Sequence, residues 1–320
     1  MLAITIQRGF TYLLRSNRHA HEEQLRSLRS AIVTTDAIAL MIEPRERPVG
    51  NGVVHRLLPW RSHRMVGPFI FADHMGPDDL APGVAVDVDA HPHLGLSTLT
   101  YLFEGRLVHR DSTGAVQTIE PGDVNWMTAG AGVSHTERTP AAEHNQPRRM
   151  HGLQSWIALP SDSEDGAPWF EHHSAAAIPH EDRGGATVRV VAGSGWGLES
   201  PVAVSSPLVL AEIKLSDEGS IVIDGEHRER AILALDGALT IAGQTLPQGH
   251  LAVLEGGSRP VLAGEGHAMV LGGAPVGKRH IWWNFVHSDP ARIEDAKERW
   301  ANQEFPKVPG DHDPWVPLPR

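Results

Sequence analysis

Two short stretches of this chain each carry two potential metal ligands separated by one residue. His91 and His93 form the first pair, and His135 and Glu137 form the second. On an extended strand, side chains two residues apart point to the same face. If two such strands are neighbours in a small barrel, their four ligands converge on one interior point. Three imidazoles and a carboxylate suit a first-row divalent metal ion, so the pattern predicts a metal site between neighbouring strands.

The composition limits the class of protein. The 32 Gly and 24 Pro in 320 residues indicate many turns, as in a chain of short strands. The absence of cysteine excludes disulfides, thiolate metal sites and cysteine nucleophiles, and it is compatible with the cytoplasmic location that we expect. A formal net charge of -11 argues against direct nucleic-acid binding, and no apolar run is long enough for a membrane span.

Strand-like runs separated by Gly and Pro turns continue along most of the chain. Residues 97–105 are β-branched and aromatic and end on glycine, which is typical of a strand followed by a turn. Residues 161–187 are polar and rich in Pro and Gly, and short strands resume from Val188. This rhythm predicts an all-β chain with two domains. Near the end, Asp289 and Pro290 predict the start of a helix.

Six motifs stand in the first half of the chain: GPF through HMGP (residues 67–77), HPH (91–93), HRDSTG (109–114), GD (122–123), AGAG through HTE (129–137) and LQSW (153–156). In their sequence and order they resemble the motifs of the pirin family, within the cupin superfamily. Together they are far more specific than an isolated His-x-His pair.

The resemblance implies a bicupin, with two β-barrels packed face to face and the metal only in the first. With the helix start at Asp289, the expected fold is all-β with a short C-terminal helix. We expect five segments in this order: a poorly ordered N-terminal extension (residues 1–40), a metal-binding cupin domain (41–160), a crossover (161–200), a cupin domain without metal (201–275), and a C-terminal helix with a Pro-rich tail (276–320).

The resemblance also implies the ligand set. Pirins bind iron through residues that correspond here to His91, His93, His135 and Glu137. The glutamate that most cupins carry three or four residues after His-x-His is absent, because Ser97 and Thr98 stand there. We expect one divalent ion per chain. The nitrogen and oxygen ligands suit Fe, Ni, Mn, Cu or Zn, and the family favours Fe(II).

Other histidines are weaker candidates. We expect that His109, on a neighbouring strand, and His74, at a pocket mouth, could contact a ligand or order metal-bound water. Structural roles for both are equally compatible with the sequence. In the second half His227, His250 and His267 are isolated, which argues against a second metal site.

Two functions fit this pattern, and a structural bicupin without metal is a third interpretation. The first is an Fe(II)-dependent dioxygenase of the quercetin 2,3-dioxygenase type, acting on a small aromatic substrate such as a flavonol. In that role Glu137 serves as a ligand and as the catalytic base that accepts the hydroxyl proton. The second is a metal-dependent regulatory protein without enzymatic activity, acting through a protein partner. The open coordination positions of four ligands on an octahedral ion favour the enzyme.

Overall fold

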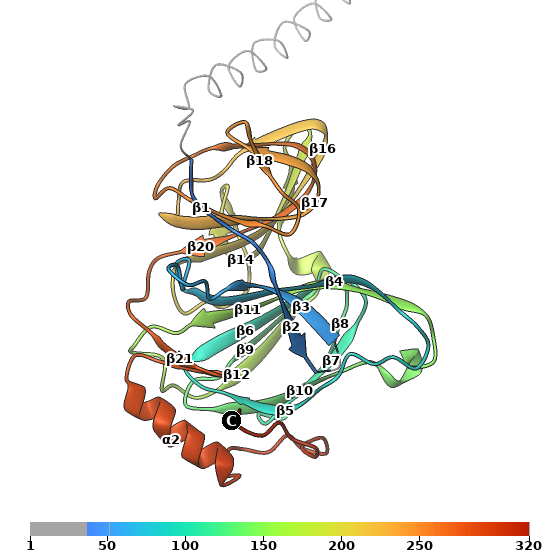
Figure 1. The fold of residues 1–320 in the computed structure, drawn as a ribbon, viewed down its shortest axis with the longest axis vertical. Helices are drawn as coiled ribbons and strands as arrows, with labels where there is room; N and C mark the ends of the chain where they lie inside the picture. The colour runs from blue at the N-terminus through green and yellow to red at the C-terminus, as the bar shows by residue number, and fades with distance from the viewer. Residues whose placement is uncertain (1–36, 51, 320) are drawn as a thin grey trace, which may run out of the picture.

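Antiparallel strands joined by short turns make up most of the computed structural model, which describes residues 37–50 and 52–319. Most of the N-terminal extension predicted at residues 1–40 therefore lies outside the described residues. Figure 1 shows two β-domains stacked along the long axis, with the second domain above the first. Within the described part of the chain, no helix is long and apolar enough to cross a membrane.

The first domain consists of two antiparallel sheets that enclose a cavity. The seven-stranded sheet has the order β12 (Trp169–His173), β9 (Val124–Thr128), β6 (Leu96–Glu104), β11 (Arg148–Ala158), β4 (Phe69–Leu80), β3 (Gly52–Leu58) and β2 (Arg45–Val49). The four-stranded sheet has the order β5 (Val88–His93), β10 (Val133–Arg138), β7 (Leu107–Asp111) and β8 (Val116–Ile119). Short 3-10 turns occur at η1 (Ala141–Glu143) and η2 (Ala175–Ala177).

The second domain is built on one nine-stranded antiparallel sheet. Its main path is β1 (Ile38–Ile42), β19 (Leu251–Leu254), β17 (Glu229–Ile241), β20 (Val261–Gly273), β16 (Leu208–Val222), β14 (Ala186–Gly195) and β13 (His180–Asp182). Two short strands pair at the side, β15 (Leu198–Glu199) with β14 and β18 (Gln244–Leu246) with β17. A cluster of aliphatic side chains that includes Val188, Ile213, Ile232 and Val270 is buried in this domain.

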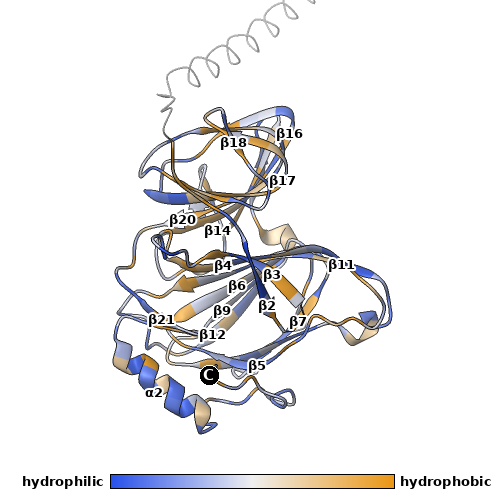
Figure 2. Ribbon diagram, in the orientation of Figure 1, coloured by the Kyte–Doolittle hydropathy of each residue, from blue (hydrophilic) through white to orange (hydrophobic). Residues whose placement is uncertain are grey.

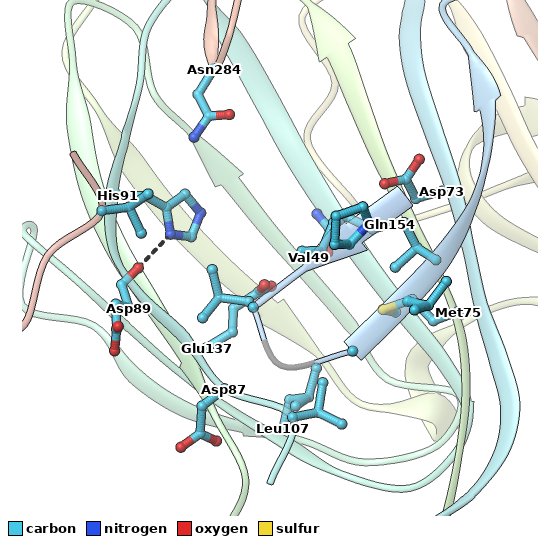
Figure 3. A pocket seen from close by; sticks show the side chains of 18 of the residues that line it. Val49, Asp73, Met75, Asp87, Asp89, His91, Leu107, Glu137, Gln154 and Asn284 are labelled. Atoms are coloured by element: carbon cyan, nitrogen blue, oxygen red, sulfur yellow. Dashed lines mark hydrogen bonds between the residues drawn. The ribbon is translucent and has the colours of Figure 1, made fainter. Parts of the chain in front are cut away.

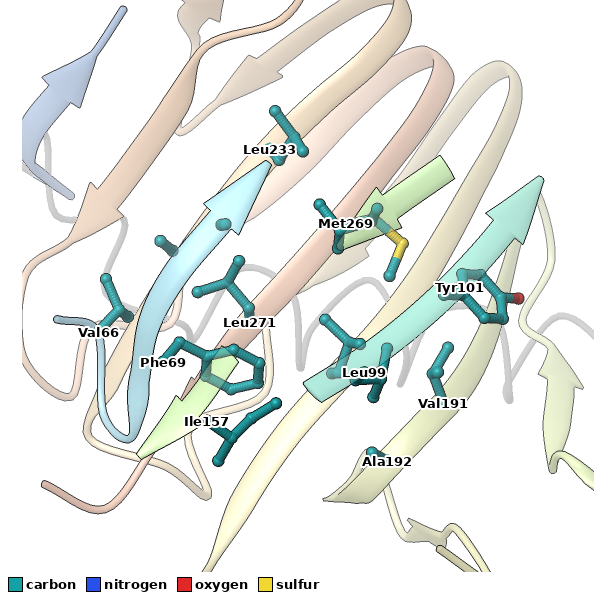
Figure 4. Packing of buried hydrophobic residues seen from close by; sticks show 14 of the residues in the cluster. Val66, Phe69, Leu99, Tyr101, Ile157, Val191, Ala192, Leu233, Met269 and Leu271 are labelled. Carbon is teal, nitrogen blue, oxygen red and sulfur yellow. The ribbon is translucent and has the colours of Figure 1, made fainter. Parts of the chain in front are cut away.

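A hydrophobic core joins the two domains, because strands of both sheets contribute to the same buried cluster. Figure 4 shows Phe69, Leu99 and Ile157 from the first domain packed against Met269 and Leu271 from the second. The central strands of the seven-stranded sheet are therefore buried on both faces: one face meets the second domain and the other lines the first domain's cavity. This explains why β6 is buried at every position from Leu96 to Leu102, and β4 from Phe69 to His74, instead of at alternate positions.

The C-terminal segment returns to the first domain. It forms the hairpin β21 (His280–Trp282) and β22 (Phe285–His287), followed by α2 (Pro290–Ala301). The predicted helix start is confirmed, since the Asp289 side chain accepts a hydrogen bond from the Ala291 N–H. In Figure 2 the helix carries both hydrophilic and hydrophobic segments, consistent with its partial burial.

Strand pairing differs from the predicted domain boundaries in two places. Strand β1, which includes the predicted first residue of the first domain, Met41, pairs with β19 of the second sheet. Strand β14 falls inside the predicted crossover at 161–200 but pairs with β16. Both pairings join segments that local sequence patterns cannot connect, because a strand's periodicity does not specify its partner.

Candidate metal centre

Strands β5 and β10 bring three of the predicted ligands together. The two strands are antiparallel neighbours, with His91 opposite His135 and His93 opposite Val133. One ligand atom from each of His91, His93 and His135 lies within 4.8 Å of the other two. The close approach follows from the two-residue spacing on adjacent strands, which turns all three imidazoles toward the interior of the domain.

All three rings are buried and are arranged to offer nitrogen lone pairs. The His91 Nδ1–H donates to the Asp89 carbonyl at 2.8 Å, which leaves Nε2 as the acceptor nitrogen (Figure 3). The Nε2 atoms of His93 and His135 face each other at 3.1 Å. Burial lowers the pKa of His91 to about 4, and burial with the neighbouring imidazoles lowers the pKa values of His93 and His135 well below 6.5. The rings are therefore neutral near pH 7, as metal ligation requires.

Glu137 lies in the same pocket but outside the three-histidine group. The strand register shifts between His135 and Glu137, and the Glu137 carboxylate accepts a 3.4 Å hydrogen bond from the Thr100 hydroxyl. Burial raises the pKa of Glu137, and the neighbouring His109 and the hydrogen bond from Thr100 only partly offset this effect. A buried carboxylate beside three neutral imidazoles is a donor set that a divalent cation would stabilise, so these residues fit a bound metal.

A buried pair, His109 and Asp111, lies on the Nδ1 side of the His135 ring. The Nδ1 atoms of His135 and His109 are 3.3 Å apart, and His109 Nε2 lies 3.0 Å from a carboxylate oxygen of Asp111. The His109 ring also stacks on Phe170, with centroids 4.7 Å apart. His109 thus contacts a member of the histidine group rather than extending the group itself. Asp111 was not among the candidate residues, although the His-x-Asp spacing on β7 places both side chains on one face; no local pattern points to Phe170.

Comparison with known proteins agrees with this geometry. The Pirin family model matches residues 51–157, and the Pirin C-terminal cupin domain model matches residues 210–306. A pirin-like protein of Caulobacter vibrioides is 43% identical over 288 residues, which cover 88% of this chain and 99% of the relative. The chain belongs to the pirin family.

Two further relatives of this pirin-family chain carry an activity in their names. A Pseudomonas aeruginosa protein provisionally named quercetin 2,3-dioxygenase is 38% identical over 81% of this chain and 82% of its own length. The crystal structure of quercetin 2,3-dioxygenase from Acinetobacter baumannii superimposes with a TM-score of 0.81. It is 33% identical in sequence and covers 88% of this chain and 95% of that one.

A cavity of about 910 Å³ opens onto the histidine group. Phe71 and Trp156 stack in its wall with centroids 3.9 Å apart, and Trp156 meets the His93 ring edge-on at 5.0 Å. On the same side Arg56 forms a two-point ion pair with buried Asp73, at 2.9 and 2.8 Å, and lies over the Phe71 ring. Burial raises the pKa of Asp73 despite this arginine. A cavity of this size accommodates a small aromatic molecule.

The C-terminal return supplies part of the cavity wall in this pirin-family chain. Ile281, Trp283, Asn284 and Val316 line the cavity beside residues of β3, β4, β10 and β11. Figure 3 shows Asn284 entering from the side of His91, opposite Leu107. Sequence patterns gave no indication of this contribution, because these residues lie far from both ligand pairs along the chain.

The predicted location of His74 is wrong. Phe71, Asp73 and Met75 line the cavity, so His74, which alternates with them on β4, points to the opposite face. There its Nε2 lies 2.9 Å from His151 Nε2. His74 therefore has a structural role outside the cavity, the second of the two roles that the sequence allowed.

The histidines of the second domain have separate partners. His227 Nε2 bonds to the Ser194 carbonyl at 3.0 Å, and His250 Nδ1 lies 3.1 Å from the Gln248 carbonyl. His267 lies 2.8 Å from Glu212, whose other oxygen accepts the Tyr101 hydroxyl across the domain boundary. His267 therefore contributes to the contact between the domains.

Proposed function

We propose that this chain binds one divalent metal ion, Fe(II), through His91, His93, His135 and Glu137. We further propose that it is a dioxygenase of the quercetin 2,3-dioxygenase type, acting on flavonol-like substrates. The observation that carries the proposal is the group of three buried, neutral imidazoles facing a cavity of about 910 Å³. The names of relatives with 38% and 33% identity support the reaction type.

The donor set explains what a bound ion would do and what the protein adds. Fe(II), when bound, supplies a Lewis acid that polarises and orients a substrate oxygen. His91, His93 and His135 would hold the ion, and the cavity that they line would admit the substrate. Because these imidazoles stay neutral, they do not need to lose a proton before binding the ion.

Glu137 is suited to accept the proton of a flavonol hydroxyl. Its pKa is raised by burial, which makes the carboxylate a stronger base than one in water. The 3.4 Å contact with Thr100 is long, so the carboxylate can exchange between the ion and a substrate hydroxyl. The Thr100 hydroxyl oxygen also lies 2.8 Å from the side-chain amide of Gln154, which holds Thr100 in place.

The cavity wall favours a flat aromatic ligand. The stacked Phe71 and Trp156 rings lie beside His93, where a fused ring can pack against the aromatic surface. Met75 and Met150 also line the cavity and supply adaptable apolar contacts. The nearby Arg56–Asp73 pair provides the polar groups that can orient ring hydroxyls.

The test combines metal analysis with oxygen uptake. Protein purified under argon and loaded with Fe(II) should hold about one iron per chain and consume oxygen with quercetin. A flavone without the 3-hydroxyl group should give no uptake, because it offers Glu137 no proton at that position. His91→Ala/His93→Ala should lose both metal and activity, whereas His227→Ala, a buried histidine of the second domain, should keep both.

Two results would overturn the proposal. If the protein held no stoichiometric metal after reconstitution, the proposed metal site would be wrong. If the protein held stoichiometric iron but consumed no oxygen with any flavonol, the proposed dioxygenase activity would be wrong. The alternative function, metal-dependent binding of a protein partner, would then be favoured.

A further inference from the structure

An unbroken line of contacts runs from a buried carboxylate to the metal-facing side of His135. Asp111 Oδ2 is 3.0 Å from His109 Nε2, and His109 Nδ1 is 3.3 Å from His135 Nδ1. On the opposite side of its ring, His135 Nε2 faces His93 Nε2 at 3.1 Å. All three members of the line, Asp111, His109 and His135, are almost fully excluded from solvent.

The carboxylate end of this line is fixed as an acceptor. Asp111 Oδ1 receives three hydrogen bonds: the Thr113 N–H at 2.8 Å, the Thr113 hydroxyl at 2.6 Å and the Ala115 N–H at 3.2 Å. Burial alone would raise the pKa of Asp111, but the bonds from His109 and Thr113 hold it below its usual value. Asp111 is therefore an anion, and its Oδ2 can only accept a hydrogen bond from His109.

Hydrogen-bond chemistry then sets the proton positions. His109 must carry hydrogen on Nε2 to donate to Asp111, so the neutral ring presents a lone pair at Nδ1. His135 must donate its own Nδ1–H to that lone pair, which leaves its Nε2 without hydrogen and facing the site. We propose that Asp111 and His109 are positioning residues that fix His135 in the tautomer able to bind a metal. This inference rests on metal binding by His135 in the proposed function, but not on the oxygenase reaction.

The ring of His109 is also held in the required plane. It stacks on Phe170 of β12 with an interplanar angle of 16°, while Asp111 is fixed by the turn that follows β7. The contacts that position His109 and Asp111 therefore involve residues of three strands, β7, β10 and β12. Carboxylate–histidine pairs behind a metal ligand orient the ligand and raise its basicity, and their loss costs about 10–100-fold in metal affinity.

Asp111→Asn tests the direction of the hydrogen bonds with little change in shape. The oxygen of the introduced amide can keep the bonds from Thr113 and Ala115, while its N–H₂ group faces His109 Nε2 and donates. His109 then carries hydrogen on Nδ1, and His135 is forced to protonate at Nε2, the metal-facing nitrogen. We expect Co(II) affinity, measured by chelator competition on the full chain, to fall about 10–100-fold. Thr113→Val, which removes one bond to Asp111 but keeps the line, should bind Co(II) nearly as the wild type does.

His109→Phe shows whether Asp111 acts through His109. The phenyl ring can still stack on Phe170 but cannot bond to His135. The single variant should lose affinity by a similar factor, and adding Asp111→Asn should cause no further loss. Independent, multiplying losses would overturn the proposal, because a purely structural aspartate would not depend on His109.

The tautomer itself can be read without metal. Long-range ¹H–¹⁵N correlation spectra of histidine-labelled, metal-free protein, assigned with His135→Gln, should show His135 protonated at Nδ1 in the wild type and at Nε2 in Asp111→Asn. A wild-type His135 protonated at Nε2, or an Asp111→Asn variant with wild-type Co(II) affinity, would overturn the proposal. Because the spectra need neither metal nor substrate, a failed oxygenase assay leaves this result interpretable.

Discussion

Gly95 follows the strand that carries His91 and His93 and packs against β22 of the C-terminal segment. Its replacement by alanine should be severely destabilising. Gly95 follows His93 by two residues and has φ +69°. A Cβ atom built there would lie 1.9 Å from the Val286 carbonyl oxygen and 3.0 Å from its carbonyl carbon. Both neighbours are backbone atoms, so no side-chain rotation can relieve the contact, and β22 must move away.

The cost of Gly95→Ala has three parts. The left-handed conformation costs a non-glycine residue about 1–2 kcal/mol. Overpacking in a tight site adds about 1–3 kcal/mol. Displacing β22 weakens the 3.0 Å hydrogen bond from the Val286 N–H to the Leu94 carbonyl, at about 1 kcal/mol. Together these predict a loss of about 3–6 kcal/mol in the free energy of unfolding.

A matched variant separates the contact from the backbone strain. Gly257 has φ +78°, and a Cβ there would meet no atom within 4 Å. Gly257→Ala should therefore lose only about 1–2 kcal/mol. Urea denaturation of both metal-free variants measures the difference. If Gly95→Ala were destabilised no more than Gly257→Ala, the close packing of β22 against the histidine strand would be refuted.

Three further predictions concern the core, the site and pH. Met269→Ala, in the core between the domains, should lose about 2–5 kcal/mol in urea denaturation, whereas Val53→Ala, at a side chain 51% exposed, should change stability by less than about 0.5 kcal/mol. Glu137→Gln should lower oxygen uptake with quercetin at least about 100-fold, since it removes the proton acceptor; a rate near that of the wild type would exclude this role. Burial lowers the pKa of His74 to about 3. As the pH falls below 6.5, His74 therefore binds a proton in the unfolded state but not in the folded state. The stability attributable to His74 is therefore complete above pH 6.5 and declines at roughly 1.4 kcal/mol per pH unit toward pH 3; urea unfolding at pH 7, 6 and 5 should show a shallower decline in His74→Gln, and equal slopes would contradict the assignment.

The face that each strand side chain occupies was only partly predictable. Alternation alone correctly placed His91 and His93 on one side of β5, because a two-residue spacing needs no knowledge of the partner strand. It could not tell which face of β4 lines the cavity, because both faces of that strand are buried and both carry apolar residues. Phe71 and Ala72 are both buried, yet one faces the cavity and the other faces the second domain. The error at His74 has this origin.

Local sequence thus determined the strands, the helix start at Asp289 and the shared direction of the histidines, because each depends on residues a few positions apart. Tertiary structure decided that β1 joins the second sheet, that Asn284 and Val316 line the cavity, and that Asp111 reaches His135 through His109. These contacts join segments that are well separated along the chain. Their partners are selected by packing and strand pairing across the whole molecule, and no local pattern encodes that selection.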